Sequence, residues 1–269
     1  MSGVMVERLV PWGPEWAEFS PHHLARYLFA ADFARDRRVL DAGAGSGYGA
    51  RLLRSAGASA VVGVDIDPEA VRLAQSQFGG DGVEFLLDDC QRLDRTTGVY
   101  DLVTNFENIE HLQDPRGFLA AAGRRLGPGG LLLVSSPDRA ASPPPVDGRP
   151  RNQFHVVEWF RDEFEKLLRE YFEDVDVRVQ VESTSLRCRR EAVAALREGM
   201  TWANPLSIST WRKWPFGSRR QRPWKQLAGF AAPSIGDYPI LPAATAALFG
   251  TPAFHVAVCR QPRQPTGNS

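Results

Sequence analysis

Residues 39 to 49 read V-L-D-A-G-A-G-S-G-Y-G. A short apolar run ends on Asp41, and glycines then occupy alternate positions from Gly43 to Gly49. This pattern predicts a buried strand that turns sharply into a helix, because glycine permits positive φ values and lets bare backbone approach a ligand. The unpaired N–H groups at the start of that helix would face the ligand. We therefore expect a nucleoside-bearing ligand at this turn.

Acidic residues at the ends of neighbouring strands decide which ligand the turn binds. In a dinucleotide fold a phosphate occupies the helix N-terminus, where the carboxylate of Asp41 would repel it. The same carboxylate suits a cationic, amino-acid-bearing ligand. The second strand ends on Asp65, placed to accept hydrogen bonds from ribose hydroxyls, and the third is followed by Asp88-Asp89-Cys90, where a carboxylate can meet an adenine amine. Together these positions predict S-adenosylmethionine (SAM).

With these residues the chain resembles the class I SAM-dependent methyltransferases, specifically the large bacterial group of types 11 and 12. The resemblance covers roughly residues 37 to 182 and includes D-x-G-x-G-x-G, a G-V-D-I-D second strand and the string N-F-E-N-I-E-H-L at 105–112. The alternative is a doubly wound domain whose glycines merely make turns, which would not require three strand-end carboxylates. The motifs and the resemblance together imply a SAM site made of Asp41, Gly43, Gly45, Gly47, Asp65, Ile66, Asp89, Cys90, Asn105 and Tyr27.

The alternation of apolar runs predicts an α/β fold with a Rossmann-like, seven-stranded, mostly parallel sheet. Strands are expected near 38–42, 61–65, 83–87, 100–105, 130–135, 175–181 and 253–259, and helices near 47–56, 68–78, 115–126 and 161–171. The resemblance implies that the last strand runs antiparallel between the fifth and sixth. We divide the chain into N-terminal lid helices (1–36), a SAM-binding core (37–182), a cap insertion (183–252), and the final strand with a flexible tail (253–269).

The composition fits one enzyme of this kind. The 269 residues include 32 Lys and Arg and 32 Asp and Glu, so the net charge of zero gives no basic field for nucleic acid. Three cysteines without metal-type spacing suit a reducing cytoplasm. No apolar stretch approaches the ~20 residues of a membrane span, and the N-terminus lacks a basic segment followed by an apolar run. We expect a soluble cytoplasmic protein.

The cap insertion is rich in tryptophan and basic residues. They are Trp202, Trp211, Trp214 and Trp224 with Arg212, Lys213, Arg219, Arg220, Arg222 and Lys225. We interpret the segment as a cap that faces the methyl acceptor. Interfaces also favour Trp and Arg, so a packed satellite or a homodimer contact is an equal alternative. An RNA-binding platform is a third.

The N-terminal segments 7–11 and 23–30 resemble the leader of bacterial methyltransferases found among sugar- and polysaccharide-modifying enzymes. The resemblance implies a helix that packs over the cofactor mouth, with His23, Arg26 and Tyr27 near the ligands. Helical spacing alone predicts instead an amphipathic helix with a buried apolar face made of Leu24, Tyr27, Leu28 and Ala31.

The string E-x-x-E-H after the fourth strand carries the chemistry. On a helical turn Glu107, Glu110 and His111 come within reach of one point, and two carboxylates with an imidazole suit Mg²⁺ or Mn²⁺. His155, in an H-x-x-E-W string, is a candidate fourth ligand. That string resembles the small-RNA 3′-terminal ribose methyltransferases, which bind a divalent metal through E-x-x-E-H and a later histidine. Ubiquinone-pathway O-methyltransferases share the E-x-x-E-H part.

Three functions follow, with Glu110, His111 and His155 as the expected catalytic residues. The first is O-methylation of a hydroxyl on a sugar, glycan or secondary metabolite, with or without the metal; without it His111 is the general base and Glu107 lines the SAM pocket. The second is RNA ribose 2′-O-methylation, opposed by the zero net charge. The third is a SAM-binding protein without catalysis. The Pro-rich segment 138–152 would have to fold back over the sheet edge to complete the site.

Overall fold

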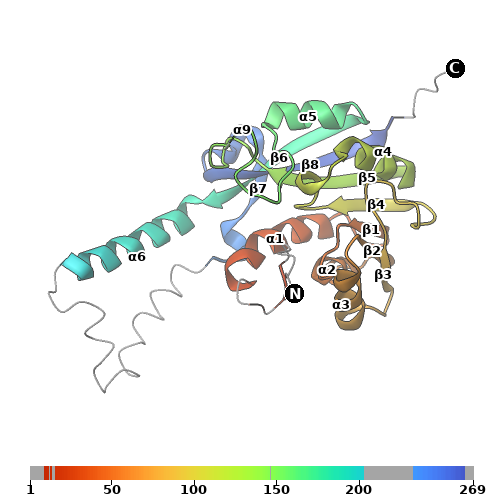
Figure 1. The fold of residues 1–269 in the computed structure, drawn as a ribbon, viewed down its shortest axis with the longest axis horizontal. Coiled ribbons are helices and arrows are strands. Elements are labelled where there is room, and N and C mark those ends of the chain that lie inside the picture. Colours follow the sequence, from red (N-terminus) through yellow and green to blue (C-terminus); the bar gives the residue numbers. More distant parts are fainter. Residues whose placement is uncertain (1–8, 12, 14–15, 146, 203–232, 264–269) are drawn as a thin grey trace.

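The structure, a computed structural model, describes residues 9–11, 13, 16–145, 147–202 and 233–263. Over these residues eight strands form one sheet in the order β3-β2-β1-β4-β5-β8-β6-β7 (Figure 1). Pairings are parallel from β3 to β5 and antiparallel around β8 and β7. The strands are β1 (Arg38–Ala42), β2 (Ala60–Asp65), β3 (Val83–Leu87), β4 (Tyr100–Asn105), β5 (Leu126–Pro137), β6 (Phe172–Ser183), β7 (Ile240–Pro242) and β8 (Gly250–Pro262).

Helices cover both faces of the sheet. One face carries α1 (Trp16–Ala31), α2 (Tyr48–Ser55) and α3 (Pro68–Phe78), and the other carries α4 (Pro115–Arg125) and α5 (Arg161–Arg169) (Figure 1). The helices on each face pack against the sheet through one apolar cluster, made of side chains from both. A longer helix, α6 (Thr184–Trp202), leaves the body of the molecule, and short turns η1 (Ile109–His111), η2 (Ile235–Asp237) and α9 (Ala243–Ala246) complete the described elements. None of these helices is long and apolar enough to cross a membrane.

The predicted mostly parallel sheet is confirmed. The first four strands begin and end within a residue of their predicted bounds, and β8 runs antiparallel between β5 and β6. The sequence missed an eighth strand, β7, inside the segment assigned to the cap. It is three residues long and ends on a proline at the sheet edge, which is too short for a period-2 pattern and admits proline because an edge strand has one unpaired side.

The N-terminal segment contains one described helix, α1, rather than several, and its buried face differs from the predicted one. Arg26 is fully buried, and Leu28, predicted to be buried, is 45% exposed. The physical reason is that the Arg26 guanidinium lies 4.6 Å over the Phe254 ring and its Nη1 donates to Gln180 Oε1 at 2.5 Å. A cation with aromatic and amide partners is therefore buried on a side of the helix that apolar periodicity left outside the buried face.

Much of the predicted cap lies outside the described residues. Residues 203–232 are not described, and they include Trp211, Trp214, Trp224 and all six basic residues named with them. The described remainder of the insertion contains all of α6, together with η2, β7 and α9. The cap interpretation thus stays a prediction.

Gly47 tests the packing at the first turn. Its φ is +88°, and an added Cβ would lie 2.7 Å from both the Ala74 and Phe85 side chains. Gly47→Ala should lower the free energy of unfolding by about 2–4 kcal/mol, from left-handed strain and overpacking. Gly129→Ala is the control, because its φ of +72° is similar but nothing lies within 4 Å of its Cβ. Chemical denaturation that gives equal losses for both variants would contradict the packing account.

Candidate functional site

The glycine turn between β1 and α2 opens onto a cavity of about 430 Å³ at the carboxyl ends of the parallel strands. Gly45 has a φ of +54°, and a Cβ there would meet nothing within 4 Å because it would point into open space. Gly43 also lines the cavity, and its own Cβ position is filled by the Asn108 side chain. Bare backbone thus faces a space suited to a nucleoside, which is the cradle that the sequence predicted.

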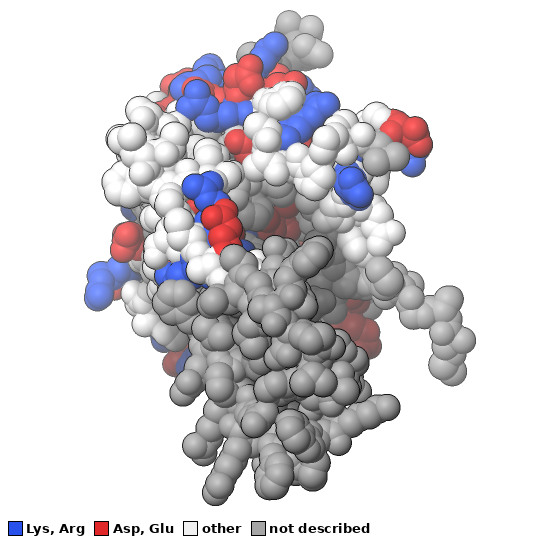
Figure 2. All heavy atoms as spheres, turned by 90° about the vertical axis from the view of Figure 1, so that its left-hand side faces the viewer, with Lys and Arg blue, Asp and Glu red and all other residues white. Residues whose placement is uncertain are grey.

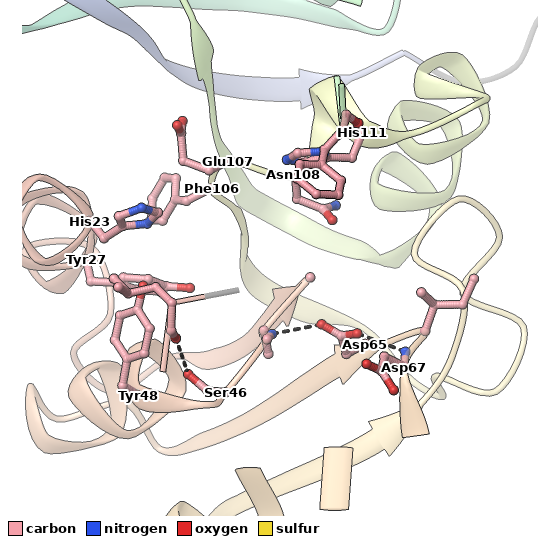
Figure 3. A pocket seen from close by; sticks show the side chains of 16 residues that line it. His23, Tyr27, Ser46, Tyr48, Asp65, Asp67, Phe106, Glu107, Asn108 and His111 are labelled. Carbon is pink, nitrogen blue, oxygen red and sulfur yellow. Dashed lines mark hydrogen bonds between the residues drawn. The ribbon is translucent and has the colours of Figure 1, made fainter. Parts of the chain in front are cut away.

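The Asp65 carboxylate fixes the shape of this cradle. Its Oδ2 accepts a hydrogen bond from Gly45 N and its Oδ1 one from Asp67 N, both at 2.9 Å (Figure 3). Each carboxylate oxygen keeps a further acceptor direction for a ligand hydroxyl. The next residue, Ile66, lines the cavity with 68% of its surface exposed, and offers an apolar face to a planar base.

Asp41 lies behind the cavity wall rather than in it. It is fully buried and accepts hydrogen bonds from Thr104 Oγ1 at 2.7 Å and from the Tyr27 hydroxyl at 3.2 Å. Burial raises the pKa of the Asp41 carboxyl to about 6, against the lowering effect of those two hydrogen bonds. Tyr27 itself lines the cavity and stands between Asp41 and the ligand space.

Other predicted cofactor residues lie near the cavity without lining it. Asn105 is fully buried and donates to Ala42 O at 2.8 Å, which ties β4 to β1. Asp89 accepts hydrogen bonds from the backbone N–H and the side-chain amide of Gln91, and Cys90 is buried. Gly47 packs against the core. The sequence did not single out several residues that do line the cavity, namely Leu9, Ala44, Ser46, Tyr48, Asp67, Phe106, Asn108 and Phe154.

A second cavity of about 990 Å³ adjoins the first. Its wall contains the aromatic rings of Phe19, Phe154 and Phe254 and segments of the Pro-rich loop. Five residues line both cavities, namely Leu9, His23, Glu107, His111 and Phe154. In Figure 3, Glu107 and His111 lie on the side of the first cavity opposite Asp65 and Asp67. A methyl group moving between two ligands would cross at these shared residues.

The structure brings Glu110, His111 and His155 together. One ligand atom of each lies within 4.8 Å of the others, and Glu110 is fully buried. His111 Nδ1 lies 3.0 Å from Phe154 O, so this nitrogen carries the proton and Nε2 presents a lone pair. His155 Nδ1 donates to Glu158 at 2.6 Å in the same way, while its Nε2 accepts from Asn152 Nδ2 at 2.9 Å. Secondary partners of this kind orient histidines that bind metals.

The residues that follow the Pro-rich segment fold back onto η1. Val156 N donates to Glu110 O at 2.8 Å, and the contact between Phe154 and His111 is a second link to η1. Together these links carry His155 to the end of β4. His155 thus converges with Glu110 and His111, which are two of its three predicted partners.

Glu107 lies apart from this group. Its backbone has a φ of +50°, its N–H donates to Ser135 Oγ at 3.1 Å, and its Oε1 accepts from the same hydroxyl at 3.0 Å. Its Oε2 lies 3.7 Å from Arg26 Nη2. Of the four predicted metal ligands the structure thus groups three, with Glu107 held by other partners.

Comparison with known proteins agrees with this geometry. A family model described as "Methyltransferase domain" matches residues 17–192. The chain belongs to this methyltransferase family. It is similar to a probable S-adenosylmethionine-dependent methyltransferase from Mycolicibacterium smegmatis, at 35% identity over 162 residues that cover 60% of this chain and 62% of that protein. The motifs, the fold and this relative identify it as a class I SAM-dependent methyltransferase.

Two further similarities are more distant. A ubiquinone biosynthesis O-methyltransferase from Bordetella avium is 32% identical over 137 residues, which cover 48% of this chain and 56% of that protein. The match thus spans about half to three fifths of these curated relatives. A phosphoethanolamine N-methyltransferase 2 of Haemonchus contortus, solved with SAM, has a TM-score of 0.51 at 17% identity and covers 88% of this chain and 52% of that one. This likeness concerns the fold alone.

Asp65 supplies the first test of the methyltransferase site. Asp65→Ala removes a charged acceptor of ligand hydroxyls and two hydrogen bonds that shape the cradle. We expect the affinity for SAM, measured by isothermal titration, to fall by about tenfold or more. Unchanged affinity in this variant, or tight binding of NAD by the parent protein, would contradict the assignment.

Asp41 predicts a pH dependence of folding. Its folded-state pKa of about 6 lies above the usual value, so its contribution to stability is present at low pH and is lost as the pH rises from about 4 to about 6. Asp41→Asn stays neutral throughout. Relative to the parent, this variant should gain about 2–3 kcal/mol of unfolding free energy between about pH 4 and pH 7. Parallel stability curves of the two ligand-free proteins would show that Asp41 does not titrate in this range.

Proposed function

We propose that the protein transfers the methyl group of SAM to a hydroxyl of a sugar, glycan or secondary metabolite, with help from a divalent ion. The observation that carries the proposal is the group of Glu110, His111 and His155 in the wall of the larger cavity, where His111 also lines the first cavity. SAM would occupy the cavity at the glycine turn and the acceptor the larger one. The alignment of two ligands across one boundary is the main contribution that the protein has to make, because SAM is already activated.

The donor set suits a divalent ion. Glu110 would offer a carboxylate oxygen to the ion, and the two histidines, whose Nδ1 atoms are engaged by Phe154 or Glu158, would offer their Nε2 atoms. Two nitrogen ligands favour Mn²⁺ over Mg²⁺, which prefers oxygen. The ion would lower the cost of deprotonating the acceptor hydroxyl. The chain's own part is to orient these ligands, and His155 would exchange its hydrogen bond from Asn152 for the ion.

A small acceptor is favoured over RNA. On the face shown in Figure 2 the described basic side chains are intermixed with acidic ones, and the whole sequence has no net charge. Binding of RNA depends on a basic surface that contacts phosphates. The aromatic wall of the larger cavity suits the apolar face of a ring instead. Methylation of RNA at low salt, or binding of SAM without any turnover, would favour the second or the third function.

Metal binding is tested first without an acceptor. Titration of the protein with Mn²⁺ should give one site, lost or weakened by about tenfold or more in Glu110→Gln and in His155→Ala. Glu107→Gln is the matched control and should keep the site, since Glu107 is bound to Ser135. If Glu107→Gln lost Mn²⁺ binding as strongly as Glu110→Gln does, Glu107 would be a fourth metal ligand, as the sequence predicted.

Turnover is tested once mass spectrometry has identified an acceptor from a panel of sugars, glycans and phenols. Activity should disappear in EDTA, return with Mn²⁺ or Mg²⁺, and be severely reduced in Glu110→Gln and His155→Ala. Full turnover by an enzyme shown to be metal-free by elemental analysis would refute a catalytic role for the metal. His111 would then act as the general base, and Glu110→Gln would be tolerated.

A further inference from the structure

Glu107 lies at the boundary between the two cavities, where the methyl donor and the acceptor have to meet. Five described residues line the two cavities together, and Glu107 is the carboxylate among them. The methyl group passes from one cavity to the other, so the sulfur that carries it has to lie at this boundary. Before transfer that sulfur is a sulfonium cation, and after transfer it is a neutral thioether. A fixed negative charge at the boundary therefore distinguishes the donor from its product.

The carboxylate of Glu107 is held rigidly. Ser135 Oγ accepts from Glu107 N and donates to Glu107 Oε1, closing a ring of two hydrogen bonds. The φ of +50° is costly for a residue with a side chain, and such strain persists where surrounding contacts impose it. The side chain is 14% exposed, so little water screens its charge.

A buried cation lies directly behind this carboxylate. Arg26 is fully buried, and its Nη2 lies 3.7 Å from Glu107 Oε2. Burial, followed by the Arg26 charge, lowers the pKa of the neighbouring His23 well below its usual value, so His23 adds no charge at neutral pH. Without Glu107, a sulfonium at the boundary would face the Arg26 guanidinium with its charge uncompensated.

We propose that Glu107 is the residue that makes the cofactor site prefer SAM over S-adenosylhomocysteine, through the charge it places at the boundary of the two cavities. Arg26 and Ser135 are positioning residues that hold its carboxylate. The preference helps the neutral product to leave after each transfer. This inference rests on SAM as the donor in the proposed function and does not depend on the metal.

The test is the ratio of two dissociation constants, measured by isothermal titration in EDTA and without acceptor. In Glu107→Gln the preference for SAM over S-adenosylhomocysteine should fall on the order of tenfold, mainly through weaker SAM binding. Glu107→Asp keeps the charge, and aspartate tolerates a positive φ, so most of the preference should remain. Binding of S-adenosylhomocysteine near the parent affinity shows that each variant is folded.

Asp67→Asn is the matched control. Asp67 lines the first cavity but not the second, and asparagine can keep its hydrogen bond from Glu69 N at the start of α3. It should change both affinities equally and leave their ratio unchanged. The inference is overturned if the ratio in Glu107→Gln stays within about twofold of the parent, or if Asp67→Asn lowers it as much.

A second variant covers the case in which Glu107→Gln does not fold. Ser135→Ala keeps the charge but removes both hydrogen bonds that hold it, so the preference should fall by about threefold or more. An unchanged ratio in Ser135→Ala would then count against the inference. A parent protein that binds neither ligand would refute the SAM assignment itself, whereas binding without metal dependence would refute the metal alone.

Discussion

The parallel pairing of β1 with β2 on one side and β4 on the other is the constraint on which the site depends. Because these strands run the same way, their carboxyl ends meet at one edge of the sheet. The chain order reverses between β1 and β4, so the connections after them diverge and leave a crevice. The Asp65 carboxylate then joins the turn after β1 to the turn after β2 through Gly45 and Asp67. These two hydrogen bonds thus fix the positions of the two turns that border the crevice.

The sequence predicted the parts of the structure that depend on local pattern. Apolar runs bounded by glycines and aspartates located the first four strands closely. The strand end at Asp65 and the glycine turn fall where they were expected. The sequence could not show that Asp41 lies behind Tyr27, because the packing of α1 against β1 is a tertiary contact and decides which carboxylate the cavity exposes.

Other features could not be predicted because they arise from tertiary contacts. Arg26 is buried by Phe254 and Gln180, more than 150 positions away along the chain, and no helical pattern assigns a guanidinium to a core. The separation of Glu107 from Glu110 has a local cause that spacing concealed. We expected one helical turn across both residues, but the helical turn begins at Ile109, and the positive φ of Glu107 directs its side chain elsewhere.

The end of β4 and the turn that follows it therefore serve three tasks within eight residues, from 105 to 112. Asn105 ties the strand to β1, Asn108 faces the first cavity and Glu110 the second, and Glu107 and His111 line both. A regular helix would place residues 107, 110 and 111 on one side. The left-handed residue at 107 breaks that repeat and separates a charge at the cofactor from the group that suits a metal. Backbone strain of about 1–3 kcal/mol is the cost of such a residue, and it is offset here by the Ser135 hydrogen bonds that hold it. One short segment can then contact both reactants because its backbone does not form a regular helix.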